Sequence, residues 1–241
     1  MTDTLTPPQS GPQDKSIYEV PQQFLLGEEI SPEQEFALAR GCVVHCAAAA
    51  LDQEHAPTTN ELADFIVQYG AGSGSEMYQD GAGWKQTAVA DLLRHDGYSV
   101  ISQNLNYGSD ETNLEQMTEA GRVRSDFEKE RLLVLSEHGG KSRENWLTAI
   151  EHSTMMRGKA VVSIRIPLLS GDGYGDHAVL VHSIDDEFVT YFDPDYYLVQ
   201  RHGENPPDIQ RVDEEKMIYR RPRQDFLGAM SGNVMHLYQA A

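Results

Sequence analysis

The sequence predicts an α+β fold in which helices from the N-terminal half pack on an antiparallel sheet built from the C-terminal half. Two observations lead to this prediction. Apolar residues recur at helical spacing mainly in the first half of the 241-residue chain, whereas short runs typical of strands follow one another in the second half. Helices followed by strands indicate an α+β domain, because βαβ units would interleave the two.

The composition is that of a folded chain with an acidic surface. Hydrophobic residues make up 39% and charged residues 24%, which is ordinary for a chain that buries a core. We expect a flexible tail over residues 1–16, where prolines break any periodic pattern, and a single domain over 17–241. The formal net charge of −19 repels a phosphate backbone, so we expect no nucleic-acid partner.

The sequence also predicts a cytoplasmic location. No segment approaches the roughly 18 apolar residues that span a bilayer, so no membrane association is expected. Residues 1–14 lack a basic stretch followed by an apolar one, which predicts no signal peptide. The two cysteines, Cys42 and Cys46, are too close on one predicted helix to form a useful staple, which fits a reducing compartment.

The helices are predicted from apolar spacing and from their end signals. Pro32 follows Ser31 at a helix start, Gly41 introduces an alanine-rich helix, and Thr59 and Asn60 precede an amphipathic one. A glycine-rich surface loop is expected over 71–83, and 110–130 is a charged stretch that is helical or partly mobile. The expected helices begin at Ser31 and include residues 42–52, 61–69, 84–95 and 146–150.

Strands are predicted over 98–101, 160–166, 177–184 and 188–192. If residues 185–187 form a hairpin loop, Ile184 faces Phe188 and Val179 faces Asp193. His177 then lies two positions along on the same face as Val179, within side-chain reach of Asp193. A loop of another length would move one residue to the other face, so this contact depends on the register.

Three residues combine into a candidate nucleophilic site. Cys42 follows Gly41 at the start of a helix, where unpaired N–H groups favour a thiolate and can bind an oxyanion, although a cysteine there can also be purely structural. His177 would act as the base. Asp193 would hold the imidazole tautomer, although an acid before Pro194 is also common in turns. Cys42, His177 and Asp193 together fill the roles of nucleophile, base and orienting group.

Other histidine and cysteine residues near Cys42 and His177 offer alternative roles. His45 and Cys46 share the helix of Cys42 and could bind zinc with it, but a closed zinc site needs about four ligands. We therefore predict no metal and no cofactor, with His45 and Cys46 as packing residues. His182 lies five residues after His177, so it is expected on the opposite face of the strand and is not the predicted base.

These motifs resemble one known family. Cys42 at a helix start, the sequence His-Ala-Val-Leu-Val beginning at His177, and Asp193-Pro194 are similar to the C39-like branch of papain-like cysteine peptidases, over roughly residues 31–200. The members resemble double-glycine leader peptidases, although Val43 stands where that family usually has glycine. The resemblance implies a papain-like cysteine peptidase fold and Cys42, His177 and Asp193 as catalytic residues.

The resemblance also implies an oxyanion-hole glutamine before the cysteine. Gln34 is the first candidate, with Gln22 and Gln23 as runners-up. The expected function is therefore that of a cysteine peptidase that forms a thioester with a peptide or protein substrate, or of a related transferase or ligase if an amine replaces water. The alternative is a catalytically silent papain-like binding or regulatory module. The sequence predicts no particular oligomeric state.

Overall fold

The computed structural model describes the chain in ten ranges: residues 41–50, 78–79, 83–95, 98–105, 125–138, 142–155, 158–167, 174–194, 209–213 and 218–238. The predicted tail over 1–16, the helix beginning at Ser31, the helix over 61–69 and the candidate glutamines Gln22, Gln23 and Gln34 all lie outside the described residues. None of the helices in these ranges is long and apolar enough to cross a bilayer.

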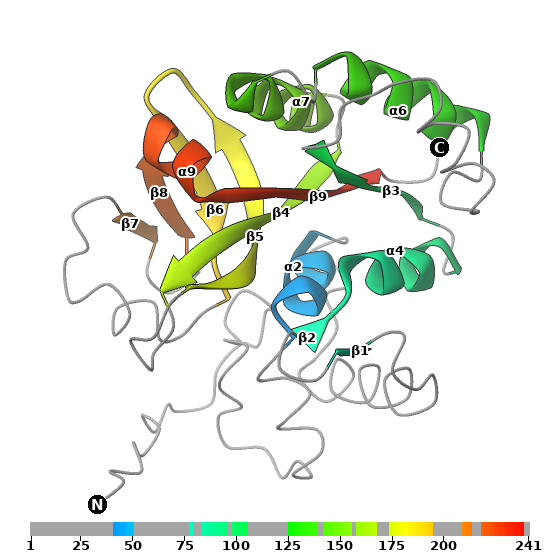
Figure 1. Ribbon diagram of the computed structural model, residues 1–241, viewed down its shortest axis with the longest axis horizontal. Helices are drawn as coiled ribbons and strands as arrows, with labels where there is room; N and C mark the ends of the chain where they lie inside the picture. Colours follow the sequence, from blue (N-terminus) through cyan, green and yellow to red (C-terminus); the bar gives the residue numbers. More distant parts are fainter. Residues whose placement is uncertain are drawn as a thin grey trace, which may run out of the picture.

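A seven-stranded antiparallel sheet forms the centre of the structure (Figure 1). Its strands follow the order β3, β9, β4, β5, β6, β8 and β7, and every neighbouring pair is antiparallel. The bounds in that order are Ser99–Asn104, Met230–Tyr238, Lys159–Pro167, Tyr174–Ile184, Phe188–Phe192, Ile218–Pro222 and Gln210–Asp213. With several helices beside this sheet, the predicted α+β class is confirmed.

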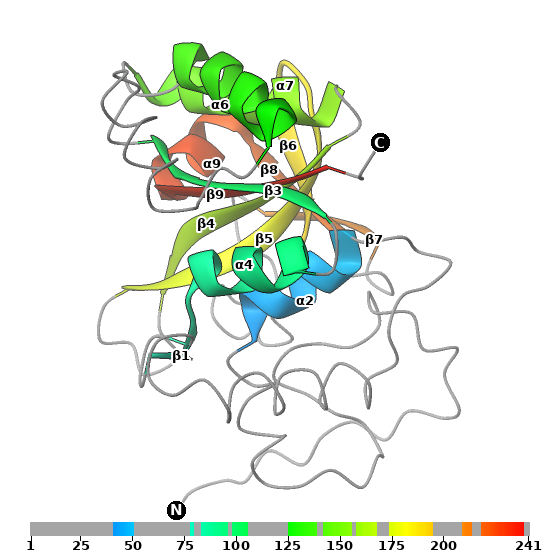
Figure 2. The same ribbon diagram turned by 90° about the vertical axis from the view of Figure 1, so that its right-hand side faces the viewer.

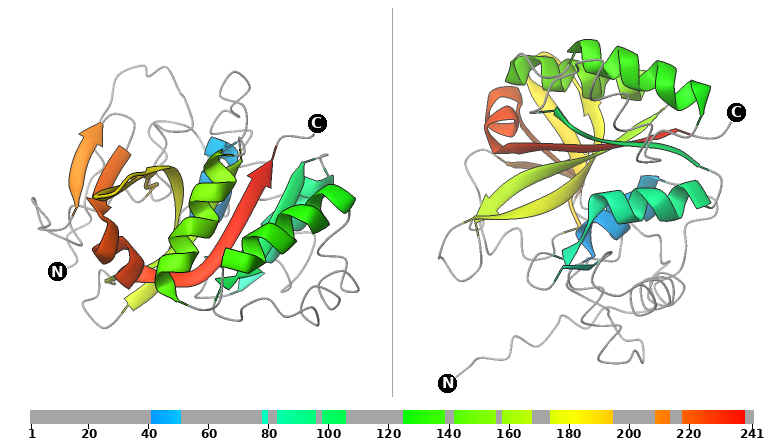
Figure 3. Two further views of the ribbon diagram at one scale, coloured as in Figure 1. Left: turned by 90° about the horizontal axis from the view of Figure 1, so that it is seen from above. Right: turned by 45° about the vertical axis from the view of Figure 1, so that its right-hand side comes forward.

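Helices cover both faces of the sheet (Figure 2). Helices α2 and α4 lie on one face, and α6 and α7 lie on the other, where they pack side by side (Figure 3). A short helix, α9, connects β8 to β9 and packs against α7. The bounds are Cys42–Ala50 for α2, Gln86–His95 for α4, Asp126–His138 for α6, Arg143–Met155 for α7 and Arg223–Ala229 for α9.

The sequence of α2 explains how closely it packs. Its nine residues, CVVHCAAAA, carry no charge, and Ala47 and Ala49 are both buried. Small side chains allow the helix backbone to approach the sheet, and α2 packs chiefly against β5 and also against β4. The start of α2 is therefore held close to the strand that carries His177.

Several predicted boundaries were wrong. The helix expected over 84–95 begins at Gln86, because Gly83–Trp84 forms strand β2, which pairs with β1 at Tyr78–Gln79. Part of the expected 71–83 loop is therefore a paired strand, in keeping with the preference of aromatic residues for strands. The strand expected over 98–101 continues to Asn104, and the charged stretch over 110–130 contributes its last residues to α6.

The C-terminal elements β7, β8, α9 and β9 were missed by the sequence reasoning, which assigned nothing after Phe192. Strand β9 lies between β3 and β4, so most of its residues are buried. Its sequence, MSGNVMHLY, mixes polar residues and a glycine with apolar residues, so it shows neither clear alternation nor a continuous apolar run.

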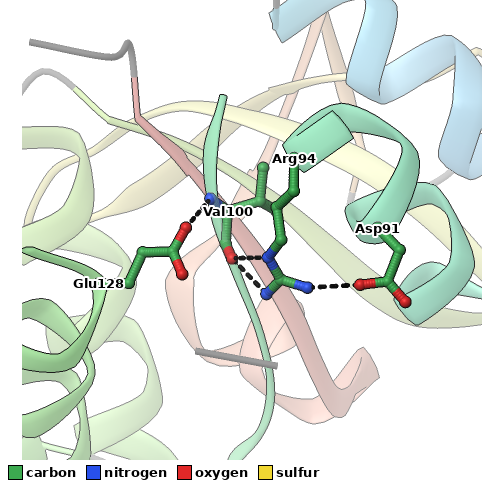
Figure 4. Close-up of polar contacts among 4 residues, drawn as sticks. All are labelled: Asp91, Arg94, Val100 and Glu128. Atoms are coloured by element: carbon green, nitrogen blue, oxygen red, sulfur yellow. Dashed lines mark hydrogen bonds and ion pairs between the residues drawn. The ribbon is translucent and has the colours of Figure 1, made fainter. Parts of the chain in front are cut away.

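Side chains from both sides of the sheet form hydrogen bonds with the backbone of the outer strand β3 (Figure 4). The N–H of Val100 donates to Glu128 Oε1 at 3.2 Å, and Arg94 Nε donates to the carbonyl oxygen of Val100 at 2.8 Å. Arg94 Nη2 donates to the same oxygen, and Nη1 pairs with Asp91 at 2.8 Å. These contacts satisfy backbone groups that an outer strand would otherwise offer to another chain.

Candidate active site

The candidate site lies where β5 and β6 run side by side. The observed register pairs Ile184 with Val189 near the turn, so the predicted facing of Ile184 and Phe188 was wrong. A register shift between Val181 and Ser183 leaves one extra residue, His182, on β5. Beyond this bulge Leu180 pairs with Phe192, which is the offset that the sequence predicted for the functional end of the hairpin.

The turn that joins these strands is tighter than predicted. The N–H of Asp185 donates to the carbonyl oxygen of Phe188 at 2.9 Å, so only Asp186 and Glu187 lie between the last paired residues. Asp185 Oδ1 accepts from the N–H groups of Glu187 and Phe188 at 2.9 and 2.7 Å. These hydrogen bonds lower the pKa of Asp185, and they support the turn that sets the register.

His177 and Asp193 meet in the interior at the other end of the hairpin. Nε2 of His177 lies 2.7 Å from Oδ1 of Asp193. The exposed fractions of the two side chains are 3% and 0%. A carboxylate at this distance accepts a hydrogen bond from the Nε2–H group and fixes the orientation of the ring. Nδ1 is then the nitrogen available to another group.

Cys42 is the first residue of α2 and is half-buried. The N–H of His45 donates to the carbonyl oxygen of Gly41 at 2.8 Å, which closes the first turn of the helix. The N–H groups of Cys42, Val43 and Val44 therefore have no acceptor within the helix. The thiol of Cys42 lies close enough to the imidazole of His177 to contribute to its raised pKa, so the structure brings Cys42, His177 and Asp193 together.

The electrostatics of the site favour a protonated imidazole. Burial lowers the pKa of His177, but the charge of Asp193, the hydrogen bond to it and the contact with Cys42 together raise this pKa well above its ordinary value. The imidazolium is then the resting form at neutral pH.

Cys46 lies one helical turn after Cys42 and is fully buried. Burial raises the pKa of its thiol well above the ordinary value, and the charges of Cys42 and Asp193 act in the same direction. Its Sγ donates a hydrogen bond to the carbonyl oxygen of Ala178 at 3.3 Å. The two thiols of α2 therefore have different surroundings: Cys46 is fully buried and stays neutral, whereas Cys42 is half-buried near His177.

The structure also locates His45 and His182, which were alternatives for this site. His45 is buried within α2. His182 occupies the bulge of β5, half-buried, and burial and the charge of Lys159 lower its pKa. No group of three or more His, Cys, Asp or Glu side chains in the described ranges is arranged to hold a metal ion. Gln34 lies outside those ranges.

Comparison of the chain with protein-family models, with curated proteins and with solved structures found no match.

Proposed function

We propose that this chain is a cysteine peptidase or a related acyl-transfer enzyme of the papain-like, C39-like type, acting on a peptide or protein substrate. Cys42 is the nucleophile, His177 the acid and base, and Asp193 the orienting group. One observation carries the proposal, namely the buried 2.7 Å contact of His177 with Asp193 beside the half-buried thiol that begins α2. This combination supports an activated thiol, because each group favours the charged form of the next.

The proposed acylation step follows from these positions. The Cys42 thiolate adds to the carbonyl carbon of the substrate, and the oxygen takes up negative charge near the backbone N–H of Cys42 at the start of α2. As the tetrahedral adduct collapses, the His177 imidazolium gives its proton to the leaving amine. The acyl group then remains on Cys42 as a thioester, with neutral His177 beside it.

Deacylation restores the starting state. Neutral His177 removes a proton from water, the resulting hydroxide adds to the thioester, and the carboxylic acid product leaves from the Cys42 thiolate. If an amine takes the place of water, the same steps form a new amide, and the enzyme is a transferase or ligase. Asp193 stabilises the imidazolium at both stages because the two groups are buried together.

A second candidate is a papain-like binding or regulatory module without turnover. Fully buried residues surround the site, and a buried ion pair can also serve packing alone. The two candidates differ in the reactivity of the Cys42 thiol. An enzyme needs a thiol that reacts at a pH where ordinary thiols are protonated, whereas a module does not.

Alkylation of Cys42 by iodoacetamide, followed by mass spectrometry of the peptide that contains it, tests the proposal. In the folded enzyme, the rate at pH 6 should exceed that of the unfolded chain by roughly a hundredfold, since ordinary thiols are protonated there. His177→Ala should remove the excess. A wild-type rate equal to that of the unfolded chain would reject the proposal in favour of the module.

Two controls complete the experiment. Cys46 should remain unlabelled in the folded protein because it is fully buried. His182→Ala should keep the fast labelling of Cys42, because the structure places this histidine at the bulge of β5 and not beside the thiol. A peptide-library cleavage profile with the wild type and Cys42→Ala would then identify the substrate sequence.

The proposed location is the cytoplasm, since both thiols are unbridged.

A further inference from the structure

The thiol of Cys46 contacts the strand that carries His177, beside that residue. Cys46 Sγ lies 3.3 Å from the carbonyl oxygen of Ala178, the residue that follows His177. Both Cys46 and Ala178 are buried. The contact joins α2 to β5 across 132 positions of the sequence, so it links the two elements that hold the nucleophile and the base.

Ala178 pairs with Ser163 of β4 on one side, and on its other side the pairing with β6 ends two residues away. Strand β6 ends at Phe192, which pairs with Leu180. Continuing that register by two residues places Pro194 beside Ala178, and proline has no N–H. A donor from outside the sheet can satisfy this oxygen, and the Cys46 thiol is placed to do so. A neutral S–H is required because a thiolate cannot donate, and burial keeps the Cys46 thiol protonated.

Because Cys42 and Cys46 lie on the same helix, fixing the position of Cys46 also fixes the position of Cys42. Residues four apart in a helix lie on one face, separated by about 6 Å along the axis. Cys42 and Cys46 stand in this relation, and the first turn between them is closed by the hydrogen bond from His45 to Gly41. If α2 slid along β5, the same movement would lengthen the contact between Cys46 and Ala178 and separate Cys42 from His177.

We propose that Cys46 is a positioning residue, whose hydrogen bond to the Ala178 carbonyl holds the start of α2 at the distance that lets Cys42 and His177 pair. The inference rests on the proposed function, since it assigns a role within that site. It gives Cys46 a task that depends on the S–H group, beyond the space that its side chain fills in the core.

Three variants separate the hydrogen bond from packing. Cys46→Val fills the space without a donor, and Cys46→Ser keeps a hydroxyl donor. Val44→Ala is the matched control, because Val44 is buried on the same helix and its truncation removes packing but no polar contact with β5. The measurements are the rate of Cys42 alkylation by iodoacetamide from pH 5 to 9 and the melting temperature of each variant.

The expected result is a change in the pH profile that stability alone does not predict. Cys46→Val should slow the alkylation of Cys42 at pH 6 by roughly tenfold or more, because small displacements of paired reacting groups are costly. At pH 9, where an unassisted thiol ionises, its rate should approach that of the wild type. Cys46→Ser should restore most of the rate at pH 6, and Val44→Ala should lower the melting temperature while keeping the wild-type profile.

The possible failures are distinguishable. If the wild type labels quickly in a His177-dependent way and Cys46→Val does the same, the positioning role is overturned and the proposed function stands. If Val44→Ala and Cys46→Val lose equal rate at pH 6, packing explains the loss and the role is again overturned. If the wild type labels no faster than the unfolded chain, the proposed function fails and the positioning role fails with it.

Discussion

His236 makes the stability of this protein depend on pH in a way that can be calculated from the structure. It lies in β9 and is fully buried, and neither ring nitrogen has a hydrogen-bond partner among the described residues. Burial, and to a lesser extent the charge of His152 on α7, lower the pKa of His236 from 6.5 to about 3. The ring is therefore neutral in the folded protein at any pH above that value.

The sign follows from proton binding. Between pH 6.5 and 3 the unfolded chain binds a proton at His236 and the folded chain does not, so acid favours unfolding. From these two values, the loss of unfolding free energy relative to neutral pH is about 2 kcal/mol at pH 5 and about 4 kcal/mol at pH 3. Domains are commonly stable by only about 5 to 15 kcal/mol, so this one residue has a large effect.

Two substitutions test the calculation by urea unfolding at pH 7, 6 and 5. His236→Gln keeps a polar side chain that does not titrate, so the difference in unfolding free energy between pH 7 and pH 5 should shrink by about 2 kcal/mol. His236→Leu should shrink it equally and should also match or exceed the wild-type stability at pH 7, because it removes a buried polar group without hydrogen bonds.

A third variant serves as the control. His152→Gln should reduce the pH dependence by a smaller amount, since its charge is the lesser of the two causes. If His236→Gln keeps the full wild-type difference between pH 7 and pH 5, another group accounts for the acid sensitivity and the reasoning about β9 is wrong.

The remaining predictions concern the site and the outer strand. His177→Ala should lower turnover by roughly a hundredfold or more, whereas His182→Ala should leave it near the wild-type rate; the opposite order would assign the base to the wrong histidine. Asp193→Ala should lower the pKa of His177, measured by NMR titration, and slow turnover strongly. Asp193→Asn should have a milder effect, because an amide oxygen still accepts a hydrogen bond from the ring N–H. Unchanged turnover per folded molecule in the alanine variant would make Asp193 a turn residue. Glu128→Ala should cost about 1 to 3 kcal/mol of unfolding free energy by leaving the Val100 N–H unpaired, and Glu128→Gln should cost less; equal losses would show that the carboxylate charge matters more than the hydrogen bond.

The sequence by itself was sufficient for the α+β class and for several of the local elements before residue 193. Helical spacing and strand-like runs report on short stretches of chain, and so the strands at 160–166, 177–184 and 188–192 were found close to their true positions. The offset that brings His177 toward Asp193 agrees with the predicted one, but only because the bulge at His182 compensates for a turn one residue shorter than expected.

Other features were decided only by tertiary structure. The position of β9 between β3 and β4, the bulge at His182 and the contact of Cys46 with Ala178 each join parts of the chain by packing or register that no local pattern encodes. The surroundings of the two thiols also depend on the fold. The sequence places Cys42 at the helix start and Cys46 one turn later, but only the fold buries Cys46 fully and brings Cys42 beside the imidazole of His177.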